Sequence, residues 1–193
     1  MTARCGTHFR GWPSSFRRIR SGAALLLLGA AVFCNGPAPR AAASAPLEYD
    51  VKAAFLLNFT KFVEWPASAF ASPDAPLNIC ILGGDPFGRA IDQLVEGESV
   101  NQHRITVERI RSDQPKACQV LFVGNGPIPA GFSAANPAVL TVGEGEDFIR
   151  QGGVIAFVID NRRVRFDISV KAATNAGLKL SSKLLSVARS VDK

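Results

Sequence analysis

The chain has 193 residues, of which 47% are hydrophobic, and its 22 basic and 16 acidic residues give a formal net charge of +6. A positive balance of this size ordinarily suggests binding to nucleic acid or to an anionic membrane surface. The position of the excess argues against both, because the first 43 residues contain no acidic residue and six arginines: Arg4, Arg10, Arg17, Arg18, Arg20 and Arg40. Without these arginines the basic residues number 16, equal to the acidic residues, so the rest of the chain is formally neutral.

Residues 1–43 have the organisation of a cleavable secretory signal peptide. An apolar run follows the arginines at residues 22–33, and its length of about a dozen residues suits a signal peptide better than a membrane span. Small residues come next, and we expect cleavage after Ala43, because Pro46 makes the alternative site after Ala45 a poor one. The sequence therefore predicts an exported protein that does not span a membrane after processing.

Residues 44–193 show no repeat, low-complexity tract or dividing linker, which predicts a single domain with a sizeable core. Apolar runs of strand length alternate with helical segments. We expect strands at 77–82, 105–110, 120–123, 139–142, 154–159 and 164–168, and helices at 51–65, 87–95, 146–151 and, with a break near Gly177, 170–191. A tight turn at Asp160 and Asn161 should join the last two strands. The pattern predicts an α/β fold, a three-layer sandwich around a mostly parallel sheet with an antiparallel edge hairpin.

The helix expected at 51–65 carries an aromatic stripe. Phe55, Phe59 and Phe62 are spaced i, i+4, i+7 and should pack into the core. Pro66 disfavours helical backbone at Trp65, which predicts that the helix ends there.

Asn58, Lys61 and Trp65 form a second stripe beside the phenylalanines. An aromatic ring beside a cation and an amide is a candidate surface for a ligand or a partner protein. The alternative is a structural role, in which Trp65 packs under the following loop.

A cationic group is expected on the last hairpin, where Arg163 and Arg165 share one face of a strand with Asp167. Protection of an exposed sheet edge, with Arg165 paired to Asp167, is one interpretation. Contact with an anion or an acidic partner is the other, so Arg163 and Arg165 join the candidate contact residues.

Two cysteines, Cys80 and Cys118, remain after removal of residues 1–43. Both lie at expected strands, and neighbouring strands would allow a disulfide, which an extracytoplasmic compartment permits. Two buried thiols are the alternative. His103, the one histidine left, stands in a polar stretch that we expect to be a surface loop. The sequence offers no metal site, catalytic group or cofactor motif.

Six segments carry a family resemblance: VKAAFLLNFTKFVEWP (51–66), ICILGGDPFG (79–88), ITVERI followed by C-x-VLFVG (105–124), VLTVGEGEDF (139–148), GGVIAFV (152–158) and RVRFDISVKAATNAGLKLSSKLLSVA (163–188). In this order and spacing they resemble the YfiR family of periplasmic proteins. The resemblance implies a periplasmic α/β protein that forms a homodimer and acts as a regulator rather than an enzyme. Cys80 and Cys118 match cysteine positions shared across the family. Some relatives have a further pair after residue 141, where this chain has no cysteine.

The resemblance also implies a partner. The best-known members bind and inhibit the periplasmic region of an inner-membrane diguanylate cyclase, which lowers cyclic-di-GMP and restrains biofilm formation. Our main hypothesis is therefore an inhibitory regulator of a membrane signalling protein, either a GGDEF-type cyclase or a sensor kinase. The alternative is a sensor that binds a small acidic or aromatic ligand.

Overall fold

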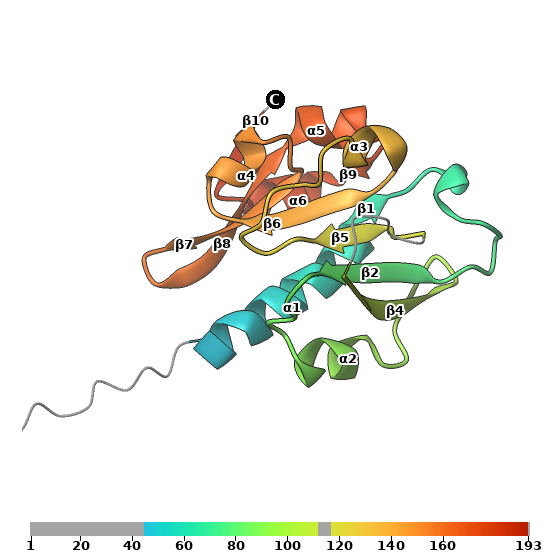
Figure 1. Cartoon of the computed structure of the whole chain (residues 1–193), viewed down its shortest axis with the longest axis horizontal. Coiled ribbons are helices and arrows are strands. Elements are labelled where there is room, and N and C mark those ends of the chain that lie inside the picture. Colours follow the sequence, from blue (N-terminus) through green and yellow to red (C-terminus); the bar gives the residue numbers. More distant parts are fainter. Residues whose placement is uncertain (1–44, 112–116, 193) are drawn as a thin grey trace, which may run out of the picture. The chain divides into compact units, whose positions relative to one another are not determined.

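The computed structural model describes residues 45–111 and 117–192, and the expected signal peptide lies outside this part. Its main feature is an eight-stranded sheet with the order β10-β8-β7-β6-β5-β2-β4-β3 (Figure 1). The strands are β2 (Leu77–Leu82), β3 (Ser99–Val100), β4 (His103–Ile110), β5 (Val120–Phe122), β6 (Leu140–Glu144), β7 (Ile155–Asp160), β8 (Arg163–Ser169) and β10 (Ser190–Asp192). All neighbours run parallel except β7–β8 and β3–β4. The mostly parallel α/β sheet is confirmed.

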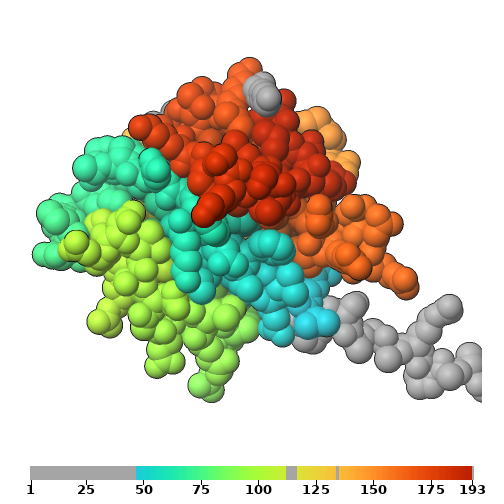
Figure 2. Space-filling model, turned by 180° about the vertical axis from the view of Figure 1, so that it is seen from behind, coloured from blue at the N-terminus to red at the C-terminus, as the bar shows by residue number. Residues whose placement is uncertain are grey.

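Helices cover both faces of this sheet, as expected for a three-layer sandwich (Figure 1). The side chains of α1 (Ala45–Phe62), α2 (Arg89–Val95) and α6 (Ser182–Val187) share the larger core cluster with one face. Phe132 of α3 (Phe132–Ala135) and Phe148 of α4 (Asp147–Arg150) share the smaller cluster with the other face. Figure 2 shows α1, in cyan, between the green α2 segment and the red C-terminal segment. In the part of the chain that is described, no helix is long and apolar enough to cross a membrane.

The first helix ends three residues earlier than its sequence predicts. It stops at Phe62, and Val63–Glu64 form the short strand β1, which pairs antiparallel with β9 (Lys179–Leu180). The main-chain N–H of Ser181 also donates to the carbonyl of Phe62. Val63 is β-branched and only 3% exposed, which suits a strand. Its pairing with Leu180, far along the chain, therefore ends the helix.

The expected C-terminal helix, 170–191, breaks near Gly177 as predicted but ends before Val191. Helix α5 (Val170–Asn175) is followed by Gly177 at φ +72°, and the N–H of Gly177 donates to the carbonyl of Thr174. After β9, Ser181 caps α6, and its hydroxyl accepts from the N–H of Leu184. Residue Val191 belongs to β10, where its register partner is Ile168.

The hairpin turn differs by one residue from the expected position. Asp160 pairs with Arg163, so the two turn residues are Asn161 and Arg162, with φ of 49° and 61°. Two consecutive positive φ angles define the turn type that matches the twist of a two-residue hairpin.

Four aromatic rings join α1 to the β7–β8 hairpin. Phe59, fully buried, stacks on Phe157 with ring centroids 5.7 Å apart and meets Phe166 edge-to-face at 5.0 Å. Phe55 contacts the same two rings at 6.2 Å and 5.3 Å. Phe62, in contrast, is 36% exposed. Two of the three predicted stripe residues therefore anchor the helix, because α1 reaches its end at Phe62.

A buried cation also ties α1 to the sheet. Lys52 is 3% exposed, and its Nζ lies 2.9 Å from Glu144 at the end of β6 and 2.6 Å from Glu48 one helical turn earlier. It also lies 4.4 Å from the centre of the Tyr49 ring. Burial lowers the pKa of Lys52, but the hydrogen bonds to both glutamates outweigh that effect and raise the pKa above its ordinary value. Lys52 therefore stays charged.

The aromatic contacts predict unequal effects for two phenylalanines of one helix. Phe59→Ala should lower the free energy of unfolding by about 4 kcal/mol, because it leaves a cavity among packed rings. Phe62→Ala should cost less than about 1 kcal/mol, since its side chain is partly in water. Denaturant unfolding of both variants measures the difference, and equal losses would contradict this packing.

A buried and an exposed lysine of α1 allow a second comparison of matched variants. Lys52→Met should lower the free energy of unfolding by about 3 kcal/mol, because it leaves Glu144 without its cation. Lys61 pairs with Glu98 at 2.8 Å, but both side chains are 39% exposed. Lys61→Met should therefore change stability by less than about 1 kcal/mol. Denaturant unfolding at neutral pH compares the free energies of unfolding of the two variants. An unchanged free energy of unfolding for Lys52→Met would show that the buried ion pair does not stabilise the fold.

Candidate functional site

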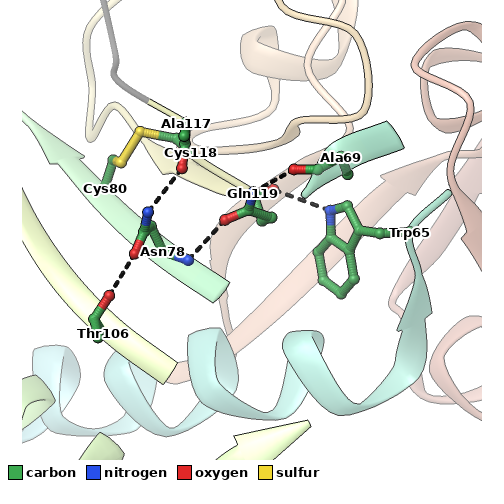
Figure 3. The surroundings of a disulfide bond; sticks show 8 residues. All are labelled: Trp65, Ala69, Asn78, Cys80, Thr106, Ala117, Cys118 and Gln119. Atoms are coloured by element: carbon green, nitrogen blue, oxygen red, sulfur yellow. Dashed lines mark hydrogen bonds between the residues drawn. A yellow bond between two sulfur atoms is a disulfide. The ribbon is translucent and has the colours of Figure 1, made fainter. Parts of the chain in front are cut away.

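The two cysteines form a disulfide across neighbouring parallel strands (Figure 3). Cys80 lies in β2 and Cys118 just before β5, with their Cα atoms 5.9 Å apart. The pairing confirms the predicted disulfide. It closes a sequence separation of 38 residues, which by chain entropy stabilises the fold by about 4 kcal/mol.

Beside the disulfide, Gln119 connects three segments through its polar atoms (Figure 3). Its side-chain oxygen accepts from the N–H of Asn78 at 2.8 Å, and its side-chain nitrogen donates to the carbonyl of Ala69 at 2.6 Å. Its main-chain carbonyl accepts from Nε1 of Trp65 at 3.2 Å. Gln119 is 2% exposed, so these contacts fix the chain after α1 against the beginning of the sheet.

Asn78 extends the same network toward β4. Its Nδ2 donates to the carbonyl of Ala117 at 2.8 Å, and its Oδ1 accepts from the hydroxyl of Thr106 at 2.5 Å. The network thus spans β4, β2 and the residues that lead into the disulfide. No sequence motif marks Asn78 or Gln119, although an amide inside an apolar strand is a signal that a partner is needed.

The predicted Asn58, Lys61 and Trp65 surface is divided in the structure. Asn58 and Lys61 are exposed, and Lys61 pairs with Glu98 beyond α2. Trp65 is half-buried, and its ring nitrogen serves the Gln119 network. The structure therefore gives Trp65 a packing role under the following loop, and leaves Asn58 and Lys61 on the surface.

Arg163 and Arg165 lie elsewhere, on the hairpin. Arg163 lies near Val51, in the first half of α1. Along the helix, Val51 is about 15 Å from Lys61 at 1.5 Å per residue. One interpretation of the sequence pairs Arg165 with Asp167, but in the structure Asp167 pairs with Arg189 instead. Asp167 is 8% exposed and bonds Arg189, at 2.8 Å to Nε and 2.5 Å to Nη2. These two hydrogen bonds, together with one that Arg189 donates to Glu146, raise the pKa of Arg189.

An apolar hollow opens between the first turns of α1 and the end of the β7–β8 hairpin. We call it the hairpin groove; it has a volume of about 620 Å³ and is lined by Leu47, Glu48, Val51, Phe55, Ile159, Arg162, Arg163 and Val164. Three of its apolar side chains are well exposed: Leu47 at 67%, Ile159 at 53% and Val51 at 38%. The first turns of α1, in blue, lie next to the orange hairpin in Figure 2. An exposed apolar cluster with a cationic rim is typical of a protein-binding surface.

A second hollow, of about 570 Å³, is polar and lies between α3, α4 and α5. Phe132, Val139 and Val154 form part of its apolar floor, while Lys171 and Asp192 stand among its charged lining residues. Its size is in the range of small-molecule sites, about 300–1,000 Å³.

His103 and Asp85 have structural roles. His103 begins β4 instead of lying in a surface loop; its Nδ1 is 2.6 Å from the carbonyl oxygen of Ala75, and its ring stacks on Phe70. In the turn before α2, Asp85 accepts from two N–H groups and pairs with Arg109, which also bonds the carbonyl of Gly88. Among the described residues no three His, Cys, Asp or Glu side chains are grouped to hold a metal ion.

Comparison with known proteins gives one decisive match. Residues 49–189 match the model of a family described as YfiR/HmsC-like. No curated protein matches the chain significantly. The crystal structure of a conserved domain protein from Vibrio cholerae O1 biovar El Tor str. N16961 is similar, with 11% identity and a TM-score of 0.44 over 75% of this chain and 60% of that one. The chain thus spans less than two thirds of that protein, and a likeness of this degree carries nothing about function. The family match covers well over half of the sequence, and on that ground the chain belongs to the YfiR/HmsC-like family.

Proposed function

We propose that this protein is a periplasmic inhibitor of an inner-membrane signalling protein, a GGDEF-type diguanylate cyclase, whose activity it lowers by binding the extracytoplasmic region. Membership of the YfiR/HmsC-like family across residues 49–189 is the observation that carries the proposal. Members of this family are periplasmic regulators, not enzymes. Signal peptide 1–43, removed on export, would bring residues 44–193 to that compartment, where the Cys80–Cys118 disulfide can form.

Within this proposal, the protein acts by contact and needs no cofactor. The candidate contact residues fall into two groups on the surface: Asn58 and Lys61 near the end of α1, and Arg163 and Arg165 on the hairpin. Trp65 is the weaker candidate, because its ring nitrogen already bonds Gln119. We further propose a homodimer, as the family implies.

Deletion of the gene is the direct test. Loss of an inhibitor should raise cellular cyclic-di-GMP and surface attachment, because the cyclase is then unrestrained. Cyclic-di-GMP is measured by mass spectrometry of cell extracts, with a plasmid copy of the gene restoring the lower level. Unchanged cyclic-di-GMP in the deletion strain would refute a cyclase as the partner.

A small-molecule sensor acting on a sensor kinase is the second candidate, and the polar hollow is the observation that favours it. Its lining combines an apolar floor with a cation and a carboxylate, which suits a small polar ligand. The predicted ligand residues Lys61, Trp65, Arg163 and Arg165 do not surround one cavity, so this hollow is the better location.

A thermal-shift screen of small acidic and aromatic metabolites tests the sensor. A ligand at 100 times its Kd should stabilise the fold by about 2.7 kcal/mol, which raises the melting temperature by several degrees. Lys171→Gln should weaken that shift, whereas Lys183→Gln, exposed on α6 outside the hollow, should not. A compound whose shift is unaffected by Lys171→Gln would place its binding elsewhere.

A further inference from the structure

The hairpin groove exists because two elements that pack tightly at one end separate at the other. Phe55 and Phe59 contact Phe157 and Phe166, so this face of the hairpin turns toward α1. Side chains alternate along a strand, and the next pair outward on the same face is therefore Ile159 and Val164, which are register partners. At that level Ile159 is 53% exposed and Val164 is only partly buried, so the apolar floor is open to solvent.

Two arginines at the groove have no partner among the described residues. Arg162 and Arg163 line it, and neither makes an ion pair or side-chain hydrogen bond with any described residue. Glu48 also lines the groove, but it pairs with Lys52 at 2.6 Å. Asp160, beside the turn, accepts a hydrogen bond from Asn161. An apolar floor with two free guanidinium groups calls for an occupant that supplies both apolar side chains and carboxylates.

A second copy of this chain does not meet that requirement. In a two-fold dimer the same patch would face itself, so the second copy would bring two more arginines and only the carboxylates of Glu48 and Asp160, which already bond groups of their own chain. Like charges placed face to face in an interface cost several kcal/mol. If the protein forms a dimer, another surface is the better one for it.

We propose that the hairpin groove is the docking site for an acidic amphipathic segment of a partner protein, whose apolar side chains fill the floor while its Asp or Glu carboxylates bond Arg162 and Arg163. This inference rests on the proposed function, which supplies the partner: the segment belongs to the extracytoplasmic region of the membrane signalling protein. Lys183 offers a control, because it is an exposed cation on α6 that does not line the groove.

Binding of two synthetic peptides to the purified chain of residues 44–193 tests the groove without the partner. Both peptides carry leucines at i, i+3, i+4 and i+7; one has glutamates at the remaining positions and the other has lysines. By fluorescence anisotropy the glutamate peptide should bind at least tenfold more tightly than the lysine peptide, and added salt should weaken its binding.

Variants locate that binding. Charge reversal at Arg162 and Arg163 together should weaken binding of the glutamate peptide at least tenfold, whereas Lys183→Glu should change its binding less than about threefold. Leu47→Ser and Ile159→Ser replace exposed side chains, so the fold should survive, and each should weaken binding. Equal binding of the two peptides, or a Lys183→Glu effect as large as that of the double reversal, would overturn the proposal. So would a dimer in sedimentation that Leu47→Ser and Ile159→Ser turn into monomers.

The same variants separate this inference from the proposed function in cells. If both hold, the double reversal at Arg162 and Arg163 should raise cyclic-di-GMP as deletion does, and Lys183→Glu should not. A deletion without effect refutes the cyclase function, but the peptide experiment still decides whether the groove binds an acidic segment. A deletion that raises cyclic-di-GMP, with a double reversal that does not, refutes the groove alone.

Discussion

The packing of α1 against the β7–β8 hairpin is the constraint on which the other features depend. Phe59 is fully buried and contacts Phe157 and Phe166, which belong to a hairpin far along the chain. This contact covers one face of the sheet and sets the line along which α1 crosses it. Lys52 fixes the same helix to β6 through Glu144, so α1 has both an apolar and an ionic attachment. The groove lies next to these contacts, between the first turns of α1 and the end of the hairpin.

The disulfide and its polar network hold the opposite end of α1. Gln119 receives the ring nitrogen of Trp65 and reaches Ala69, while the Cys80–Cys118 disulfide fixes the strands beneath. That end is consequently occupied by internal contacts. The hairpin end has exposed apolar side chains and two arginines without a partner among the described residues. This contrast is why we assign partner binding to the hairpin rather than to Trp65.

Sequence patterns identified the buried strands well and the ends of helices poorly. Strand β2 has the predicted bounds, because six consecutive residues with a largely apolar character leave little alternative in an α/β fold. The boundary at Phe62 was missed because Val63 finds a partner at Leu180, far along the chain. The same holds for β10, whose pairing with β8 captures residues that alone would continue a helix. Local propensity cannot include a hydrogen-bonding partner that arrives only with folding.

By itself, the sequence determined the α/β class, the family and the two cysteines able to pair, since these follow from local apolar patterns and from residue identities in order. The tertiary structure decided which charged residues have partners. It paired Asp167 with Arg189 instead of Arg165, buried Lys52 between two glutamates, and separated Lys61 from Arg163. Charge pairing depends on distances of a few ångströms between segments remote in sequence, and those distances exist only once the chain has packed.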